Sequence, residues 1–398
     1  MTNSKFALTG RLGAVGLFAA ILCTTGCNSD GEITPIPPDE VNLTRREVLG
    51  KRLFFDTNLS EPVGLSCGGC HNPDTAFSGN NDSTVGVPKG SRVGILGLRN
   101  TPSAMYAGFA PMFAMIEDVE GITPTGGQFL DGREDTLAGQ ARRPFVSELE
   151  MNNVDVPSVV AKVSRSSYAD LFKDEWGTDI FSRPDDAFTA IVVSIEAFEQ
   201  TERFHPFTSK YDKYIQGKAQ FTAAETRGLA LFMDPDKGNC VGCHVADPTS
   251  KDPRDSLFTD FTYDNLGVPR NTAIPANADP AFFDLGLCGP KRVPPSDDTS
   301  LCGAFKVPTL RNAARKPALM HNGFFKDLKT LVAFYVTRDT DPARWYPGGL
   351  KFDDLPPGYR GNVNTSEVPY DRKPGDAPAL DDAEIDDLVA FLRTLTDE

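Results

Sequence analysis

Two short segments that share one pattern constrain this chain more than any other feature. Residues 67–71 read CGGCH and residues 240–244 read CVGCH, so both have the form Cys-x-x-Cys-His. This pattern is typical of c-type haem attachment. Two thiols at this spacing bond to the two vinyl groups of one porphyrin, and the histidine that follows binds the iron. The sequence therefore predicts two covalently attached haem c groups, held by Cys67, Cys70, His71, Cys240, Cys243 and His244.

A structural zinc ion or a redox-active thiol pair is the alternative for such a segment. Zinc would need two further Cys or His ligands at a matching spacing, and neither segment has them. A thioredoxin-like thiol pair does not require a histidine after the second cysteine, and here a histidine follows both times. We therefore favour haem at both segments.

The charge balance narrows the partners of the protein. The chain of 398 residues carries 55 Asp and Glu against 40 Lys and Arg, which gives a net charge of −15. Nucleic acid binding relies on basic residues that meet the phosphates, so no nucleic-acid partner is expected. The negative charge favours a partner with a basic face instead.

The first 26 residues predict an export signal. A basic stretch precedes an apolar run over residues 12–22, and small residues follow directly before Cys27. This resembles a bacterial lipoprotein site, at which Cys27 would carry the lipid; secretion without a lipid is the alternative. The polar, Pro-rich stretch after it predicts a tether over residues 27–43. We expect a periplasmic protein that contacts the membrane only through this lipid, since no second apolar run approaches membrane length.

Two more cysteines lie outside the leader and the haem motifs. Cys288 and Cys302 are fourteen positions apart in a stretch rich in Gly and Pro. In an oxidising compartment a disulfide that closes this loop is favoured over a metal site.

The segment before each haem motif is repeated. Thr44 with Glu47, and Thr222 with Glu225, have the spacing of a helix capping box. The two predicted helices then carry the same residues in equivalent places, namely Gly50 and Gly228, Leu53 and Leu231, and Phe54 and Phe232.

Each half of the chain also ends on an amphipathic helix. Residues 188–200 place Ile191, Ile195 and Phe198 on one face. The second such helix is capped by Asp381 and Glu384, and its apolar face is formed by Ile385, Leu388, Leu392 and Leu395. A helix, a haem motif, a long loop and a closing helix, present twice, predict a mainly α fold of two cytochrome-c-like domains with long irregular loops. The predicted domains are 44–215 and 216–398.

Nine segments, which include the two haem motifs, carry a resemblance that extends over about residues 45–395. They are LGKRLFFDTNLS (49–60), SCGGCHNPDTAFS (66–78), RNTPS (99–103), GGQFLDGREDTLAGQA (126–141), ELEMNN (148–153), GLALF (228–232), CVGCH (240–244), FKVPTLRNAA (305–314) and MHNGFF (320–325). With these segments the chain resembles the bacterial di-haem cytochrome c peroxidase and MauG superfamily. The resemblance implies that the haem of the first half reacts with hydrogen peroxide and that the haem of the second half transfers electrons.

The resemblance also implies roles for three residues. Gln140 and Glu150 match the distal-pocket residues beside the peroxide-reactive haem, where a carboxylate can move a proton between the two peroxide oxygens. An ordinary surface acid is the alternative for Glu150. Asn100 matches a residue that helps bind Ca²⁺ between the domains, since an amide oxygen suits this ion; a turn cap before Pro102 is the alternative.

Two departures from the family pattern concern the first haem and the path between the haems. The peroxidases carry a removable distal histidine in the loop that corresponds to residues 82–94, and the matching position here is Val87. The first haem is therefore expected to be five-coordinate and open to peroxide, as in MauG-like enzymes. The inter-haem Trp of the family is Leu130 here. Phe129 or Trp345 could replace it, although packing is favoured for Trp345.

A third departure concerns the sixth ligand of the second haem. By register the family's Met or Tyr positions are Pro317 and Leu319, and neither side chain can bind iron. Met320 or His321, which follow directly, is the candidate ligand. His205 precedes a proline and is interpreted as a structural residue.

These features favour a MauG-like oxidase. Hydrogen peroxide would bring the two haems to a high-valent state that oxidises a Trp or Tyr side chain of an exported partner protein. The suggested subtype resembles MbnH, the methanobactin-associated MauG homologue. The alternative is a cytochrome c peroxidase that reduces hydrogen peroxide to water with electrons from a small cytochrome or copper protein. A plain electron-transfer cytochrome is disfavoured by Gln140 and Glu150.

Overall fold

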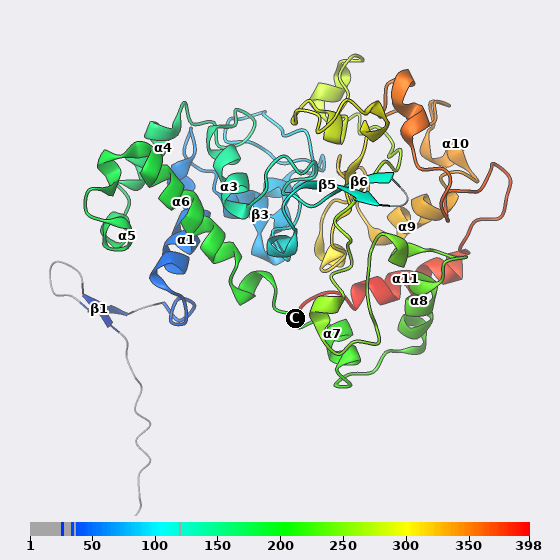
Figure 1. The fold of residues 1–398 in the computed structure, drawn as a ribbon, viewed down its shortest axis with the longest axis horizontal. Coiled ribbons are helices and arrows are strands. Elements are labelled where there is room, and N and C mark those ends of the chain that lie inside the picture. The colour runs from blue at the N-terminus through cyan, green and yellow to red at the C-terminus, as the bar shows by residue number, and fades with distance from the viewer. Residues whose placement is uncertain (1–24, 28–32, 36, 119–120) are drawn as a thin grey trace, which may run out of the picture. The chain divides into compact units, whose positions relative to one another are not determined.

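The computed structural model describes residues 25–27, 33–35, 37–118 and 121–398 (Figure 1). It divides into two units, residues 1–44 and 45–398. In the first unit, strands β1 (Thr25–Cys27) and β2 (Ile33–Pro35) form an antiparallel pair. The predicted leader lies outside the described residues except for Thr25 and Gly26, and the predicted tether is described only in part.

The second unit is mainly helical, which confirms the predicted fold class. Its α-helices are α1 (Arg45–Phe55), α2 (Cys67–Cys70), α3 (Leu137–Val146), α4 (Val156–Val163), α5 (Ala169–Trp176), α6 (Pro184–Glu199), α7 (Lys210–Ile215), α8 (Ala223–Met233), α9 (Leu328–Thr337), α10 (Pro342–Trp345) and α11 (Asp382–Arg393). Long loops with short 3-10 turns connect them. Among the described residues, no helix is both long and apolar enough to cross a membrane.

Strands contribute little to the second unit. Three short antiparallel pairs are formed by β3 (His71–Asn72) with β4 (Ser78–Gly79), β5 (Ala114–Asp118) with β6 (Gly121–Thr125), and β7 (Tyr263–Asp264) with β8 (Phe305–Lys306). The first of these pairs begins at the histidine of the first haem motif and folds the loop behind it into a tight hairpin.

The repeated segments form the same helix pair in both halves. Helix α1 packs against α6, and α8 packs against α11 (Figure 1). Both crossings are built on the equivalent glycines. A Cβ atom at Gly50 would overlap the backbone carbonyl of Ser194 in α6, and one at Gly228 would overlap that of Asp387 in α11. A residue without a side chain is therefore required where each pair of backbones comes closest.

The capping boxes predicted for α8 and α11 are present, and the box predicted for Thr44 and Glu47 stays a prediction. Thr222 and Glu225 cap α8 reciprocally, and Asp381 and Glu384 do the same for α11. The predicted apolar faces of α6 and α11 are buried.

Two hydrophobic cores form, one in each half. The core residues of the first run from Leu49 to Phe204 and those of the second from Tyr211 to Leu395. Tyr211 and Ile215 of α7 belong to the second core, so the division of cores falls between residues 204 and 211. The two cytochrome-c-like domains with a boundary at 215 stay a prediction.

Buried polar contacts join the two halves. The guanidinium of Arg99 donates to both carboxylate oxygens of Asp284 (2.6 and 2.7 Å) and to Asp131 (2.7 Å). The hydroxyl of Tyr106 donates to the carboxylate of Asp397 (2.8 Å). Because these groups are buried, removing one partner would leave the other charge or hydroxyl unpaired away from water.

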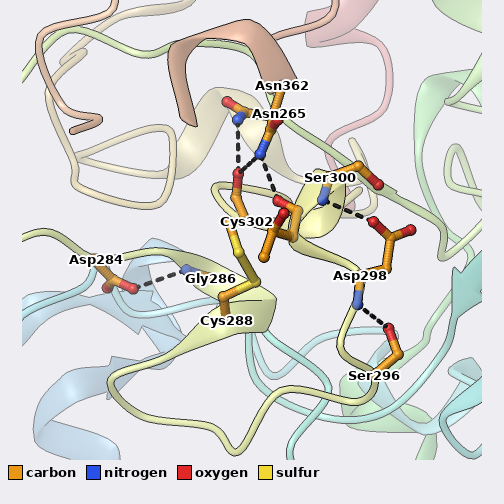
Figure 2. The surroundings of a disulfide bond; sticks show 10 residues. Asn265, Asp284, Gly286, Cys288, Ser296, Asp298, Ser300, Cys302 and Asn362 are labelled. Carbon is orange, nitrogen blue, oxygen red and sulfur yellow. Dashed lines mark hydrogen bonds between the residues drawn. A yellow bond between two sulfur atoms is a disulfide. The ribbon is translucent and has the colours of Figure 1, made fainter. Parts of the chain in front are cut away.

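The predicted disulfide is present. Cys288 and Cys302 are bonded, and their Cα atoms lie 5.0 Å apart (Figure 2). The side-chain amides of Asn265 and Asn362 both donate to the carbonyl of Cys302. The closed loop is therefore held against two other segments of the second half.

The helix crossings give a first prediction. Gly50→Ala should lower the free energy of unfolding by about 1–3 kcal/mol, because the added methyl group overlaps a backbone that cannot move aside. The melting temperature, measured by circular dichroism, checks this.

Gly358→Ala is the matched control, because no atom lies within 4 Å of a Cβ built at Gly358. Equal melting temperatures for the two variants would contradict the proposed role of Gly50 at the crossing.

Candidate haem sites

The two motif histidines are held in the same way. Nδ1 of His71 lies 2.9 Å from the carbonyl oxygen of Phe77, and Nδ1 of His244 lies 3.0 Å from that of Phe258. A carbonyl can only accept, so Nδ1 carries the proton in both rings. The lone pair is then on Nε2, the nitrogen that would bind iron.

Burial keeps both imidazoles neutral. It lowers the pKa of His71 and of His244, and repulsion from the Lys316 ammonium adds to the effect at His71. A neutral imidazole is the form that binds a metal. The four motif cysteines are unbonded and only partly covered, as thiols that react with a porphyrin must be.

A single continuous cavity joins the two motifs. Its wall includes His71 of the first motif and Cys240, Cys243 and His244 of the second, and apolar side chains of both halves supply most of the remaining lining. Flat apolar porphyrins need such walls, with a neutral imidazole at hand and thiols at the edge. The residues therefore fit the two predicted haems, with His71 and His244 as iron ligands.

Gln140, in α3, lines this cavity, and Glu150 lies near the first motif without lining it. Glu150 follows α3 in a turn and is partly buried. Burial raises the pKa of the Cys70 thiol to about 12, and the Glu150 carboxylate adds to the rise, so this carboxylate lies within electrostatic range of the first motif.

The loop over residues 82–94 supports the Glu150 turn. The backbone N–H of Ser91 donates to the carbonyl of Glu150 (2.8 Å), and Gly90 packs against Leu149 without room for a side chain. Val87, at the position of the removable histidine, is fully buried. The loop thus carries no histidine and fixes the backbone of the predicted proton-transfer residue.

Asn100 joins the first half to residues 318–321. Its side-chain amide donates to the carbonyls of Ala318 (2.9 Å) and Met320 (3.1 Å), and its amide oxygen accepts from Asn80 (2.9 Å). The hydrogen bonds of this side chain are thus made to protein groups. A calcium ion at Asn100 stays a prediction.

Met320 and His321, the candidate sixth ligands, lie on the same cavity. The His321 ring stacks on Phe305, with ring centres 3.8 Å apart, and its Nε2 lies 3.4 Å from the Asp354 carboxylate. Met320 packs against the second core. Both residues therefore already have packing partners, and ligation by either one stays a prediction.

Two tyrosines beside the second motif were missed by the sequence interpretation. Tyr335 in α9 and Tyr370 line the cavity, with ring centres 5.9 Å apart. Burial raises the pKa of Tyr335, and the thiols of Cys240 and Cys243 add to the rise, which places its hydroxyl within their electrostatic range. Within the described chain, neither tyrosine hydroxyl has a hydrogen-bond partner. The sequence signal that could have found Tyr335 is a tyrosine within the apolar stretch 331–336 of α9.

Glu199 was also missed, because its sequence context is that of an ordinary helix end. It lies at the end of α6, lines the cavity and is 6% exposed. Its Oε2 atom has no hydrogen-bond partner among the described residues. Burial, and the nearby Glu196, raise its pKa to about 8, so the carboxyl is mostly protonated at neutral pH.

The region between the motifs contains no tryptophan among the described residues that line the cavity. Leu130 and Phe129 line it, and the guanidinium of Arg133 lies 3.4 Å from the centre of the Phe129 ring. Trp345 packs in the second core against Phe325 and Phe334. This packing is the role that the sequence favoured for it.

The known proteins that this chain resembles include di-haem peroxidases and MauG proteins. The family model described as di-haem cytochrome c peroxidase matches residues 44–220. The methylamine utilization protein MauG of Paracoccus denitrificans is 36% identical over 357 residues, which cover 88% of each chain.

The solved structures that resemble this protein include two that are informative. The diheme peroxidase BthA of Burkholderia thailandensis is 44% identical with a TM-score of 0.84, over 92% of this chain and 91% of that one. A MauG-like protein associated with microbial copper homeostasis is 25% identical with a TM-score of 0.63, over 91% and 92% of the two chains.

The raised pKa of Glu199 gives a second prediction. The folded state keeps a proton on this carboxyl up to about pH 8, whereas the unfolded state releases it near 4.5. The folded state therefore binds more protons between these values, and stability falls as the pH rises through this window. Glu199→Gln should remove the part of this stability loss that the Glu199 carboxyl causes.

The measurement is the melting temperature between pH 5 and pH 8.5 for the wild type and the variant. Glu202→Gln, at an exposed position three residues further on, is the control. Parallel pH curves for wild type and Glu199→Gln would contradict the assignment.

Proposed function

Because the chain belongs to the di-haem cytochrome c peroxidase and MauG family, we propose that it uses hydrogen peroxide to oxidise a Trp or Tyr side chain of a partner protein. It is a haem-dependent oxidoreductase by family. The observation that carries the finer assignment is the loop over residues 82–94, which has the buried Val87 where the peroxidases have a removable histidine. A first haem without a second protein ligand would meet peroxide without prior reduction.

The two motifs would hold the haems covalently. Cys67 and Cys70 would bind the first porphyrin and His71 its iron, with Cys240, Cys243 and His244 as their equivalents in the second half. Haems bound there would supply the redox chemistry by which peroxide is reduced and electrons are withdrawn from a partner.

Glu150 and Gln140 act on the peroxide in this proposal. A carboxylate oxygen of Glu150 would accept a proton from one oxygen of hydrogen peroxide and return it to the other, which leaves as water; the two electrons that break the O–O bond would come from the bound haems. The Gln140 side chain, which lines the cavity, donates a hydrogen bond that orients the peroxide. The Ser91 hydrogen bond keeps the Glu150 turn in place for this transfer.

The third prediction tests this chemistry. Peroxide added to the fully oxidised protein should change the haem absorption spectrum within one turnover and without a reductant. Glu150→Gln should slow this change by about 10²–10⁴-fold, the usual contribution of a positioned proton-transfer group. Stopped-flow absorption measures both rates.

Glu148→Gln is the matched control, because Glu148 is exposed and only two positions away. A protein that responds to peroxide only after one haem has been reduced, and that turns over with a small reduced cytochrome, would instead be a cytochrome c peroxidase. An undiminished rate in Glu150→Gln would remove the role assigned to this carboxylate.

We propose that the Tyr335 hydroxyl is the sixth ligand of the second haem iron. Its hydroxyl lies within electrostatic range of both motif thiols and has no hydrogen-bond partner in the described chain, whereas His321 and Met320 are already packed. A phenolic oxygen is an established type of haem ligand. This assignment differs from the alignment with the family, which placed the ligand positions at Pro317 and Leu319.

The fourth prediction separates the two tyrosines. Tyr335→Phe should convert the second haem from six-coordinate to five-coordinate, visible in its electron paramagnetic resonance and absorption spectra. Tyr370→Phe, which removes a hydroxyl from the same cavity, should leave the coordination unchanged. The reverse pattern would assign the ligand to Tyr370, and no change in either variant would restore Met320 or His321.

Location and partner complete the proposal. The leader favours export to the periplasm, with a lipid at Cys27 as the only membrane contact, and the net charge of −15 favours a partner with a basic face. A copper-associated client of the MbnH kind is not favoured over others, since the similarity to BthA exceeds that to the copper-associated protein.

A further inference from the structure

One partly buried lysine in the cavity wall has no partner among the described residues. Lys316 follows a 3-10 turn over Ala313–Arg315 and lines the cavity that joins the motifs. No hydrogen bond or ion pair of its ammonium group is found among the described residues. The other lysine that lines this cavity, Lys306, donates to the carbonyl of Gly127.

The position of Lys316 relates it to the first motif, although it belongs to the second half. The guanidinium of the preceding residue, Arg315, donates to the carbonyl of Asp74 (2.8 Å) in the loop directly after His71. Repulsion from the Lys316 ammonium lowers the pKa of His71, so the two groups lie within electrostatic range. The turn before Lys316 is thus docked on the loop that orients the first histidine.

The charge of Lys316 needs an anion. Burial lowers the pKa of Lys316 to about 8, and no carboxylate of the described chain opposes this shift. An unpaired ammonium group in a largely apolar wall is unfavourable, and an ion pair with an anion would offset this. A haem in the first site would bring two propionate carboxylates into the same cavity.

We infer that Lys316 forms an ion pair with a propionate of the first haem and thereby ties that haem to the second half of the protein. This inference rests on the proposed haem at residues 67–71. Lys316 is a positioning residue here, since it would act on the haem edge and not on the peroxide.

The test uses the holoprotein, with haem at Cys67 and Cys70 first verified by peptide mass. Lys316→Gln should shift the propionate bending bands in the resonance Raman spectrum, and Lys316→Arg should preserve them. Removing a cation beside the haem disfavours electron uptake. Lys316→Gln should therefore lower the equilibrium constant for reduction of the first haem about tenfold, which is about 59 mV towards negative potential.

Lys329→Gln is the control, because it removes the same charge from an exposed position in the second half. Unchanged Raman bands and potential in Lys316→Gln would overturn the inference. So would a change in the spin state of the first haem, which would identify Lys316 as an iron ligand. None of these readouts uses peroxide, so failure of the ion pair is distinguishable from failure of the proposed oxidation.

Discussion

Each motif histidine is oriented by one hydrogen bond to the carbonyl of a phenylalanine, Phe77 in the first half and Phe258 in the second. Both phenylalanines have a left-handed backbone, with φ of 51° and 55°. This conformation is costly for a residue with a side chain, so packing has to impose it. The packing comes from the repeated helices, since Phe54 contacts Phe77 and Phe232 contacts Phe258, with ring centres 6.2 and 5.7 Å apart.

The helix crossings are therefore the origin of the geometry of the two motif histidines. Gly50 and Gly228 let two backbones approach, and this approach sets where the phenylalanine one turn later lies. The ring of this phenylalanine packs against the left-handed phenylalanine that follows the motif. The backbone carbonyl of the left-handed phenylalanine then fixes the proton on Nδ1 of the motif histidine. The same sequence of contacts occurs in both halves, which is why one duplicated segment is enough to build two similar sites.

The two sites share this helix pair and its oriented histidine, and they differ in the polar side chains nearby. The first half contributes carboxyl groups, Glu199 in the cavity wall and Glu150 within electrostatic range of the first motif. The second half contributes the hydroxyls of Tyr335 and Tyr370 to the cavity wall. This difference matches the function proposed above, in which the first site moves protons on peroxide and the second has a closed coordination.

The helices and their caps could be predicted from the sequence, whereas many of the polar side chains in the cavity wall could not. Capping boxes and periodic apolar residues are local signals, so α8 and α11 were found with their caps. Burial of a charged residue depends on what packs over it, and nothing local marks Glu199 as buried or places Lys316 in the cavity wall. Tyr335 was missed for a related reason, since its helix reads as plain core.

The segment over residues 313–321 shows why the two sites have to be considered together. It belongs to the second half, yet Arg315 binds the loop after His71 and Asn100 of the first half binds the carbonyls of Ala318 and Met320. Leu130 offers no aromatic ring at the position of the family's tryptophan, whereas the neighbouring Phe129 lines the cavity. The segment over residues 313–321 is bonded to the first half near both of its ends, so the part of the cavity wall that it forms is fixed relative to the first motif.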